Sequence, residues 1–281
     1  MKAPVNHIRL TKLKEGVLQQ QDDLIAVEEP LEIRLGYGDV LDRQQQKIAV
    51  TMRTPGADLE LAVGFLFTEG IIRSNDDVES VKHCTDVGSD DEKGNVVRVE
   101  VKPNVKVILK SLERNFYTTS SCGICGKTSI DAIKTTQEYR IPILKGIVTQ
   151  QTLLNLSSIV ISEQTVFAHT GGLHASAIFN VEGKLLLLRE DVGRHNALDK
   201  IIGEGLLHDK IPLESIILWV SGRASFELIQ KAAMAGIMML VAVGAPSSLA
   251  VKLAQETAIT LVGFSKNNSF NIYSHPERIK I

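Results

Sequence analysis

The chain has 281 residues, a length that fits one large domain or two modest ones. Its 44% hydrophobic and 23% charged residues are typical of a soluble globular protein, and the net charge of −2 gives no sign of bulk affinity for nucleic acid or acidic membranes. The N-terminal segment has no apolar core of signal-peptide length, and no apolar run reaches about 18 residues. We therefore expect a cytoplasmic protein that does not cross a membrane.

Residues 1–117 have the pattern of a strand-rich α+β domain. Segments 31–35 and 48–53 are rich in β-branched or alternating residues, and 96–101 (VVRVEV) alternates apolar and polar side chains, so all three are predicted strands. Between them, residues 58–69 place apolar side chains on one face at helical spacing, which predicts an amphipathic helix.

Residues 118–128 (TTSSCGICGKT) are small, polar and rich in glycine, so we expect a flexible loop between two halves of the chain. The loop contains Cys122 and Cys125, and the third cysteine of the chain is Cys84. Three cysteines are too few, and odd in number, for a disulfide framework. In the cytosol, where thiols stay reduced, a Cys-x-x-Cys pair indicates chemistry or metal binding.

From residue 129 onward the pattern changes to alternating strands and helices. Residues 149–162 have helical spacing, and two strand-like segments, 175–180 and 184–189, are joined by a hairpin turn. A β-α-β-α-β series follows: strand 215–220, helix 225–235 with Ser225 placed to cap it, strand 238–243, helix 247–257 and strand 260–264. This order predicts an α/β domain over 129–281, with a parallel or mixed sheet covered by helices.

The Cys122–Cys125 pair is compatible with three kinds of chemistry. A structural zinc site needs four ligands. His83 and Cys84 would have to supply the other two, but they are adjacent in sequence and lack the spacing of a zinc-ligand pair. A thioredoxin-like dithiol belongs at a strand–helix junction, whereas this pair is surrounded by Ser, Gly and Thr. A sulfur carrier needs a nucleophilic thiolate on a mobile mount, and Lys127 would lower the thiol pKa. We favour the carrier, with an inert loop as the remaining alternative.

Four further polar segments are candidate ligand contacts: 169–174 (HTGGLH), 189–196 (REDVGRHN), 220–225 (VSGRAS) and 264–269 (FSKNNS). The second and third follow predicted strands and precede helices, and open α/β sheets bind ligands at such positions. A helix N-terminus after a glycine-containing turn can also hold a phosphate. Residue chemistry alone favours a polar turn for 264–269, although an aromatic ring beside an ammonium would suit a purine nucleotide.

These segments together resemble the FdhD family of formate dehydrogenase accessory proteins over nearly the whole chain. The resemblance is carried by Glu29–Leu31 (EPL), Arg53–Asp58 (RTPGAD), Leu61–Phe65 (LAVGF), Thr68–Ile72 (TEGII), Ser121–Lys127 (SCGICGK), Thr170–His174 (TGGLH), Glu190–Ala197 (EDVGRHNA), Asp199–Lys200 (DK), Ser221–Glu227 (SGRASFE), Ala245–Ala250 (APSSLA) and Thr260–Phe264 (TLVGF). Several of these motifs are long, so the resemblance is specific.

The resemblance implies a sulfurtransferase that accepts persulfide sulfur from a cysteine desulfurase and delivers it to the bis-molybdopterin guanine dinucleotide cofactor of formate dehydrogenase. Cys122 would bear the persulfide, and Cys125 would assist it. The implied cofactor-binding residues are Phe264, Ser265, Lys266, Asn267, Asn268 and Ser269. Family members often carry an arginine near the end of this segment, where this chain has Asn268 and Ser269.

The resemblance further implies a homodimer, GDP as a mimic of the cofactor, and a cytidine-deaminase-like three-layer sandwich with a mixed sheet for residues 129–281. The deaminase signature H-x-E…P-C-x-x-C is absent from the sequence, so deamination and a catalytic zinc are disfavoured. Two rival functions stay open. One is a cofactor-binding chaperone for formate dehydrogenase that does no chemistry, and the other is a small zinc-binding module.

Overall fold

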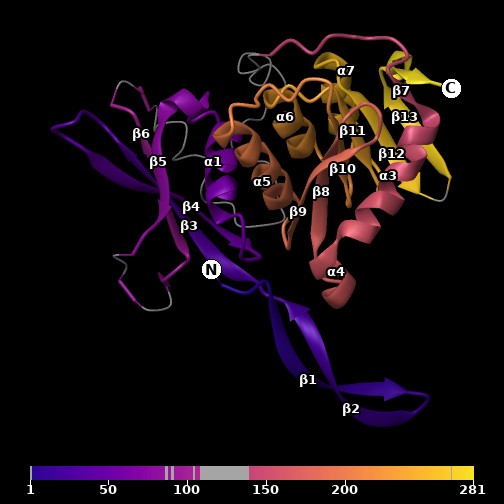
Figure 1. Cartoon of the computed structure of the whole chain (residues 1–281), viewed down its shortest axis with the longest axis horizontal. Coiled ribbons are helices and arrows are strands. Elements are labelled where there is room, and N and C mark those ends of the chain that lie inside the picture. The colour runs from indigo at the N-terminus through magenta and orange to yellow at the C-terminus, as the bar shows by residue number, and fades with distance from the viewer. Residues whose placement is uncertain (1, 86–87, 90–91, 104, 108–138, 267) are drawn as a thin grey trace.

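The computed structural model describes residues 2–85, 88–89, 92–103, 105–107, 139–266 and 268–281. Cys122, Cys125 and the predicted loop 118–128 lie outside these residues, as does Asn267. Figure 1 shows three parts: a hairpin that projects from the N-terminal end, a small sheet with one helix, and a larger sheet with several helices. Within the described ranges, no helix has the length and apolar character needed to span a bilayer.

The smaller sheet has four strands in the order β4-β3-β6-β5. These strands are β3 (Glu29–Tyr37), β4 (Gln44–Arg53), β5 (Val78–His83) and β6 (Val96–Val101), and a short 3₁₀ helix, η1 (Asn75–Asp77), precedes β5. β3 and β6 are parallel, whereas the other two pairs are antiparallel. Helix α1 (Asp58–Thr68) buries Leu61 and Leu66 in the core that it shares with this sheet. The predicted helix and strands of this region are thereby confirmed.

The larger sheet has six strands in the order β13-β12-β11-β10-β8-β9. Their bounds are β8 (His174–Phe179), β9 (Leu185–Asp191), β10 (Ile217–Val220), β11 (Met239–Ala242), β12 (Thr260–Lys266) and β13 (Ser269–Ser274). β10 pairs in parallel with β11, and β11 with β12, whereas β8 and β13 run in the opposite direction. β9 is antiparallel to β8 and therefore runs with β10. The sheet is mixed, which is one of the two predicted arrangements.

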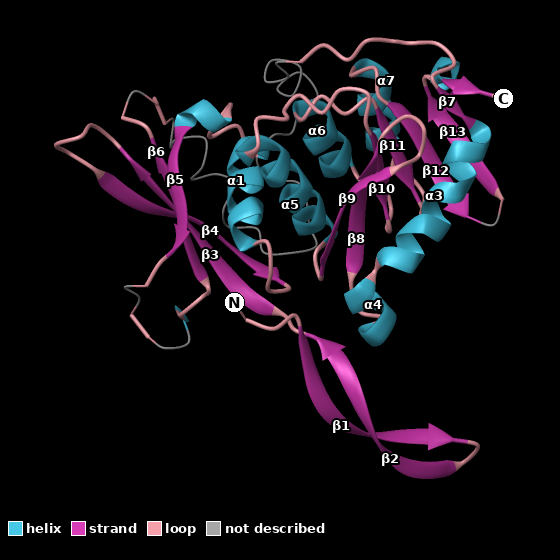
Figure 2. Ribbon diagram, in the orientation of Figure 1, coloured by secondary structure: helices cyan, strands magenta, loops and turns pink. Residues whose placement is uncertain are grey.

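Helices cover both faces of this sheet, as Figure 2 shows. α5 (Arg194–Leu207), α6 (Phe226–Met234) and α7 (Ser248–Glu256) follow β9, β10 and β11, and α3 (Gln150–Glu163) and α4 (Thr165–Thr170) precede β8. The buried ring of Trp219 in β10 donates to Ser157 of α3, Nε1 to Oγ at 3.0 Å, which fastens α3 to its face of the sheet. The mixed α/β class is confirmed, while the cytidine-deaminase likeness and the boundaries 1–117 and 129–281 remain predictions.

The C-terminal end of the chain is tied down beside α3. A short strand, β7 (Val148–Thr149), pairs in parallel with β14 (Ile279–Lys280), which follows the 3₁₀ helix η4 (Pro276–Arg278). The fully buried Arg278 donates to Thr260 Oγ1 at 2.9 Å and to the carbonyl of Pro142 at 2.7 Å. The last residues therefore close the core.

The two sheets are joined by a close crossing of α1 and α5. A Cβ on Gly64 would lie 1.9 Å from the Asp199 carbonyl oxygen, and one on Gly203 would lie 1.8 Å from the Glu60 carbonyl oxygen. Only glycine permits two backbones to approach this closely. A buried ion pair lies near the crossing, where Lys231 of α6 donates to both carboxylate oxygens of Asp199 at 2.8 Å.

The N-terminal hairpin was not predicted from the sequence. β1 (Val5–Lys14) and β2 (Val17–Ala26) pair antiparallel over ten residues each and form a sheet of their own. Glu15 and Gly16 make the turn with φ of 51° and 80°, the positive values that a tight two-residue hairpin loop requires. We call this hairpin, residues 5–26, the arm.

Candidate functional site

The carboxyl ends of β9, β10, β11 and β12 lie along one edge of the larger sheet, and α5, α6 and α7 begin there. The antiparallel β8 starts at the same edge, because His174 pairs with Asp191 at the end of β9. The polar segments that the sequence singled out therefore meet at this edge: 169–174, 189–196, 220–225 and the described residues of 264–269. Open α/β sheets bind ligands at this kind of position.

His174 and Ser221 form the centre of this edge. Ser221 Oγ accepts the Ala175 amide at 3.0 Å and lies 3.1 Å from His174 Nδ1, so its own proton is free for that ring nitrogen. A Cβ on Gly222 would lie 3.5 Å from His174 Cε1 and 3.7 Å from Arg194 Cδ. The imidazole and the arginine thus converge over a backbone position that carries no side chain.

His195 lies beside the start of α6. Its Nε2 is 3.3 Å from Ser225 Oγ, and burial, with Lys231, Arg194 and His174 nearby, lowers the pKa of His195 to about 3. The ring is therefore neutral near pH 7. Ser225 is the N-cap residue of α6, but its side chain makes no capping hydrogen bond. The predicted cap is wrong in this respect, because the hydroxyl contacts His195 instead.

Arg194 places a positive charge beside His174 and His195. Its Nε is buried and has no hydrogen-bond partner among the described residues, and Arg223 is exposed on the next turn. Burial and the Arg194 charge lower the pKa of His174. The N-termini of α5, α6 and α7 add partial positive charge at this edge. The arrangement favours an anionic ligand, since helix N-termini and an unpaired guanidinium are both phosphate-binding groups.

The turns after β10, β11 and β12 are hydrogen-bonded side by side. The Gly244 amide donates to the Gly222 carbonyl at 3.0 Å, and the Phe264 amide donates to the Gly244 carbonyl at 3.2 Å. Phe264 has φ of 53°, and the residue is 40% exposed. A bulky residue in the left-handed region is a strained outlier of the kind that clusters at ligand sites.

The remaining residues predicted to bind a cofactor differ in solvent exposure. Lys266, Asn268 and Ser269 are exposed, whereas Ser265 is buried and its carbonyl accepts from Ser157 Oγ at 3.1 Å. Among the members of the predicted set that the structure describes, Ser265 is thus the least accessible. Phe264 and Lys266 lie toward the carboxyl end of β12, a strand that also contacts α3.

A family model described as FdhD/NarQ matches residues 26–280. The chain belongs to the FdhD/NarQ family. Curated relatives are named "Sulfur carrier protein FdhD". The protein from Streptomyces coelicolor is 46% identical over 97% of this chain and 95% of its own length, and that from Sulfurisphaera tokodaii is 42% identical over 98% and 99%. A crystal structure of a putative formate dehydrogenase accessory protein from Desulfotalea psychrophila matches with a TM-score of 0.73 at 23% identity, covering 99% of this chain and all of that one.

The family match does not identify the residues of the site. Cys122 and Cys125 lie outside the described residues, so their position relative to the sheet edge is a prediction. Cys84 is a free thiol. His83 Nε2 lies 3.8 Å from the Asp58 carboxylate, and no cluster of three metal-binding side chains occurs in the ranges that the structure describes.

The turn that presents Arg194 and His195 is held by Asp191, which sequence reasoning did not single out. Its buried carboxylate accepts the Gly193 amide at 2.8 Å, Asn196 Nδ2 at 2.9 Å and the Thr54 amide at 3.2 Å, and it pairs with Lys200 Nζ at 2.7 Å. The motif EDVGRHN at the end of the strand indicated a ligand-binding segment. It did not indicate that Asp191 has a structural role, because that role depends on Thr54, about 140 positions away in sequence.

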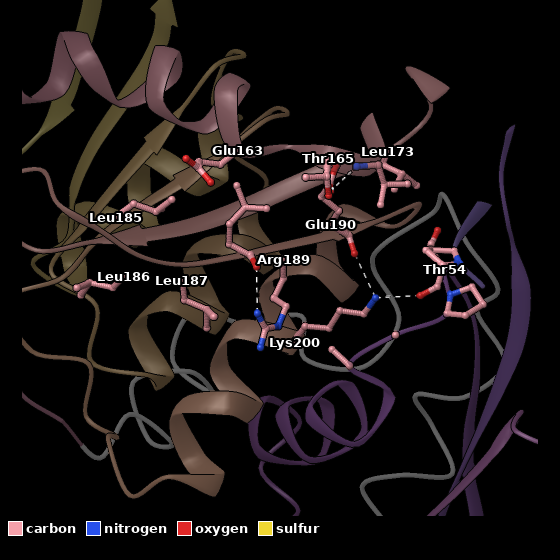
Figure 3. Close-up of a pocket in the computed structure, with 16 residues that line it drawn as sticks. Thr54, Glu163, Thr165, Leu173, Leu185, Leu186, Leu187, Arg189, Glu190 and Lys200 are labelled. Atoms are coloured by element: carbon pink, nitrogen blue, oxygen red, sulfur yellow. Dashed lines mark hydrogen bonds between the residues drawn. The ribbon is translucent and has the colours of Figure 1, made fainter. Parts of the chain in front are cut away.

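A cavity of about 530 Å³ lies between β9 and the segment 54–57, as Figure 3 shows. Its wall includes the leucines 185–188 of the edge strand. Most of the charged side chains that line it already have hydrogen-bond partners: Lys200 donates to the Thr54 and Glu190 carbonyls, and the Glu190 carboxylate accepts two amides at the start of α4. The carboxyl edge, with its unpartnered Arg194 Nε, is therefore the better candidate site.

Proposed function

We propose that the chain is a sulfur carrier for formate dehydrogenase, with Cys122 as the persulfide-bearing residue. The observation that carries the proposal is family membership over residues 26–280 together with the motif SCGICGK. The relatives named sulfur carriers support it. The partners proposed with it are a cysteine desulfurase, formate dehydrogenase and a second copy of the chain, all in the cytoplasm.

The transfer begins with the Cys122 thiolate attacking the terminal sulfur of a desulfurase persulfide. A new S–S bond forms at Cys122 while the desulfurase cysteine leaves as its thiolate, so no external oxidant or reductant is consumed. Cys125 would assist the onward transfer. The acceptor substrate is the bis-molybdopterin guanine dinucleotide cofactor.

The basic edge of the larger sheet suits the phosphates of that acceptor. Arg194, Arg223 and Lys266 carry the positive charge, and the exposed ring of Phe264 provides a stacking surface for a purine. His174 and the neutral His195 would hold or move a proton nearby. These roles rest on the geometry of the described residues and on the anionic chemistry of a guanine dinucleotide.

Mass spectrometry after incubation with a cysteine desulfurase and cysteine tests the sulfur step. Wild-type protein should gain one sulfur atom, and a peptide map should place it on Cys122. The Cys122→Ala variant should gain none, whereas Cys125→Ala should still be loaded. If Cys122→Ala gained as much sulfur as the wild type, Cys122 would not be the persulfide-bearing residue.

Replacing both cysteines by serine distinguishes a carrier from a chaperone that does no chemistry. The carrier hypothesis expects the double variant to leave formate dehydrogenase inactive, even though it still binds GDP. Full activation of the enzyme by the double variant would instead favour the chaperone.

Binding of GDP and of guanosine tests the acceptor site separately. Charge-assisted hydrogen bonds contribute about 1.5–3 kcal/mol, so Arg194→Gln should weaken GDP binding roughly tenfold or more and leave guanosine binding unchanged. Arg9→Gln, on the distant arm, is the matched control. Equal GDP affinity in wild type and Arg194→Gln would show that the phosphates lie elsewhere.

A further inference from the structure

β9 is an edge strand of the larger sheet, and its outer edge is rich in leucine. It comes last in the strand order, so β8 is its only sheet neighbour in the part of the chain that the structure describes. Four consecutive leucines, 185–188, occupy the strand, and Leu186 is 48% exposed. Natural proteins protect sheet edges with charged residues, proline or a covering segment, because unpaired backbone groups attract other strands. A leucine-rich edge is therefore a candidate surface for pairing with another chain.

The hydrogen bonds of β8 show which backbone groups of β9 face outward. The Ala175 carbonyl accepts the Ser221 amide at 3.0 Å, and the Ala175 amide donates to Ser221 Oγ at 3.0 Å, so both groups of Ala175 point away from β9. Ala175 is paired in register with Glu190, and this pair therefore exchanges no hydrogen bonds. Glu190 and, by alternation along the strand, Leu188 direct their amide and carbonyl groups outward.

The hydrogen bonds of two side chains agree with this direction. Lys200 Nζ donates to the Glu190 carbonyl at 3.2 Å, and Arg189 Nη1 donates to the Leu188 carbonyl at 3.1 Å. The outward amides of Leu188 and Glu190 have no hydrogen-bond acceptor among the described residues. These two amides remain available to the carbonyl groups of another strand.

Leu185 faces outward as well, at the start of the strand. Its register partner on β8 is Phe179, which lies an even number of residues after Ala175 and therefore points its backbone groups the same way. The register shifts by one residue just after this pair, and Leu186 is the bulged residue. The open edge therefore starts at Leu185 and continues to the two outward amides.

The open edge also lines the cavity of about 530 Å³ between β9 and the segment 54–57. Figure 3 shows Glu163 and leucines 185–187 among the residues that line it. The volume lies within the range of about 300–1,000 Å³ that is typical of ligand pockets. Glu163 is exposed and has no hydrogen bond or ion pair with another described residue, so its carboxylate leaves a negative charge uncompensated. An occupant that is apolar and carries a positive charge complements this cavity.

We propose that the outer edge of β9 binds an extended peptide segment of a partner protein by strand addition. Apolar side chains of the segment lie against the leucines, and a basic side chain lies beside Glu163. In this mode of recognition, backbone hydrogen bonds give affinity and the alternate side chains give specificity. β9 ends at Asp191, and the turn that presents Arg194 and His195 follows it, so the added strand holds the partner's chain next to the ligand edge. The proposal goes beyond the sulfur and nucleotide chemistry, and its test needs neither.

Fluorescence polarisation with the labelled peptide TVTVTVK measures binding to the full-length protein. We expect a dissociation constant below about 1 mM, and binding of TVTVTVE should be roughly three- to tenfold weaker because Glu163 repels its carboxylate. The same basic peptide with N-methylated valines keeps its side chains but loses backbone donors, so its affinity should fall about tenfold or more. Glu163→Lys should reverse the order of the two charged peptides, whereas the control Glu214→Lys, at an exposed position outside the cavity, should keep it.

Amide hydrogen exchange identifies the strand that the peptide pairs with. The amides of Leu185, Leu188 and Glu190 should exchange about tenfold more slowly when the basic peptide is bound. The amide of Leu187 faces β8, so its exchange should stay unchanged. Protection confined to residues outside β9 would overturn the proposal.

Two variants of β9 complete the test. Leu188→Pro removes one outward amide, which edge strands tolerate, and should weaken peptide binding about tenfold while circular dichroism shows an unchanged fold. Leu186→Lys replaces an exposed side chain, so it should weaken binding of the basic peptide even if the proline variant does not fold. No binding of TVTVTVK to the wild type would overturn the proposal. Equal binding of the N-methylated peptide would also overturn it, and would indicate a pocket for a small apolar molecule.

Discussion

At the scale of single residues, the fold depends on the buried ion pair of Asp191 and Lys200. Asp191 accepts four donors from residues in two parts of the chain, and one of them, Lys200, is only 2% exposed. The same lysine also donates to the Thr54 and Glu190 carbonyls. Neither charge can be removed alone without leaving the other uncompensated, which is much costlier than losing an exposed ion pair.

Replacement of Lys200 by methionine keeps most of the side-chain volume and removes the charge. We expect a loss of about 3–5 kcal/mol in the free energy of unfolding, because the Asp191 carboxylate remains buried. Urea denaturation measures the change. Lys252→Met, at an exposed position of α7, is the control and should stay within about 0.5 kcal/mol of wild type. Equal stability of the two variants would show that the buried pair is not needed.

His195 gives the folded protein a defined pH dependence. Its folded-state pKa is lowered to about 3 by burial and neighbouring cations, below the unfolded value of about 6.5. The unfolded chain therefore binds the proton more tightly, and the stabilising effect is complete above pH 6.5 and lost as the pH falls toward 3.

Comparison of wild type with His195→Gln isolates this contribution from other titrating groups. Between pH 6.5 and 4, wild-type stability should fall more steeply than that of the variant, by at most about 1.4 kcal/mol per pH unit. Thermal or urea unfolding at several pH values gives the two slopes. Parallel slopes would contradict a neutral buried His195.

At the scale of elements, the crossing of α1 and α5 depends on glycines at Gly64 and Gly203. Helix propensity alone favours alanine over glycine by about 1 kcal/mol. A steric clash opposes alanine at these positions, because a Cβ at either one would lie within 2 Å of a backbone carbonyl oxygen. The clash exceeds the propensity gain, since backbone cannot rotate aside as a flexible side chain does.

The Gly64→Ala variant should therefore lose stability, by roughly 1–3 kcal/mol or more through overpacking. Gly205→Ala, in the partner helix α5, is the control, because its Cβ would meet only the ends of the Ile211 and Leu213 side chains at 3.3 and 3.4 Å. We expect the control to be near neutral or slightly stabilising. The difference in urea midpoint measures the effect, and equal midpoints would argue against the close crossing.

At the scale of the whole molecule, several polar contacts join the two sheets. Asn196 donates to the Met52 carbonyl at 2.8 Å, and Arg189 forms a two-bond pair with Glu60 at 2.7 and 3.1 Å. Together with the glycine crossing and the Asp191–Thr54 contact, they make separate unfolding of either part costly. The described body should behave as one cooperative unit.

Trp219, the single tryptophan of the chain, reports on the larger sheet, whereas far-UV circular dichroism reports on the whole backbone. We expect their urea transitions to coincide within error, as two-state unfolding requires. An earlier loss of circular dichroism signal, with tryptophan fluorescence unchanged, would show that the smaller sheet unfolds alone.

Local pattern predicted the elements that bury at least one face. Alternation in 96–101 and helical spacing in 58–69 correspond to β6 and α1, and the β-α-β-α-β series corresponds to β10 through β12. The arm was missed because its strands are almost entirely exposed. β2 carries five consecutive polar residues, 19–23 (QQQDD), which break the alternation expected of a half-buried strand.

The sequence indicated the polar segments of the candidate site one by one, but not that they lie together. The strand-end rule indicated that 189–196 and 220–225 lie at ligand positions, and the sheet order then placed them side by side. Contacts such as His195 with Ser225, 30 positions apart, depend on tertiary packing. The sequence gives no local signal for them, nor for the role of Asp191.

The Arg194 charge beside His174 has a consequence for ligand binding. Burial and Arg194 lower the pKa of this imidazole, and a phosphate lying between the two would offset the repulsion and raise the pKa again. Binding would then take up protons, and affinity would increase as the solution becomes more acidic. Calorimetric titration with GDP in two buffers of different ionisation enthalpy would reveal this uptake, whereas identical heats in both buffers would show that the ring does not sense the anion.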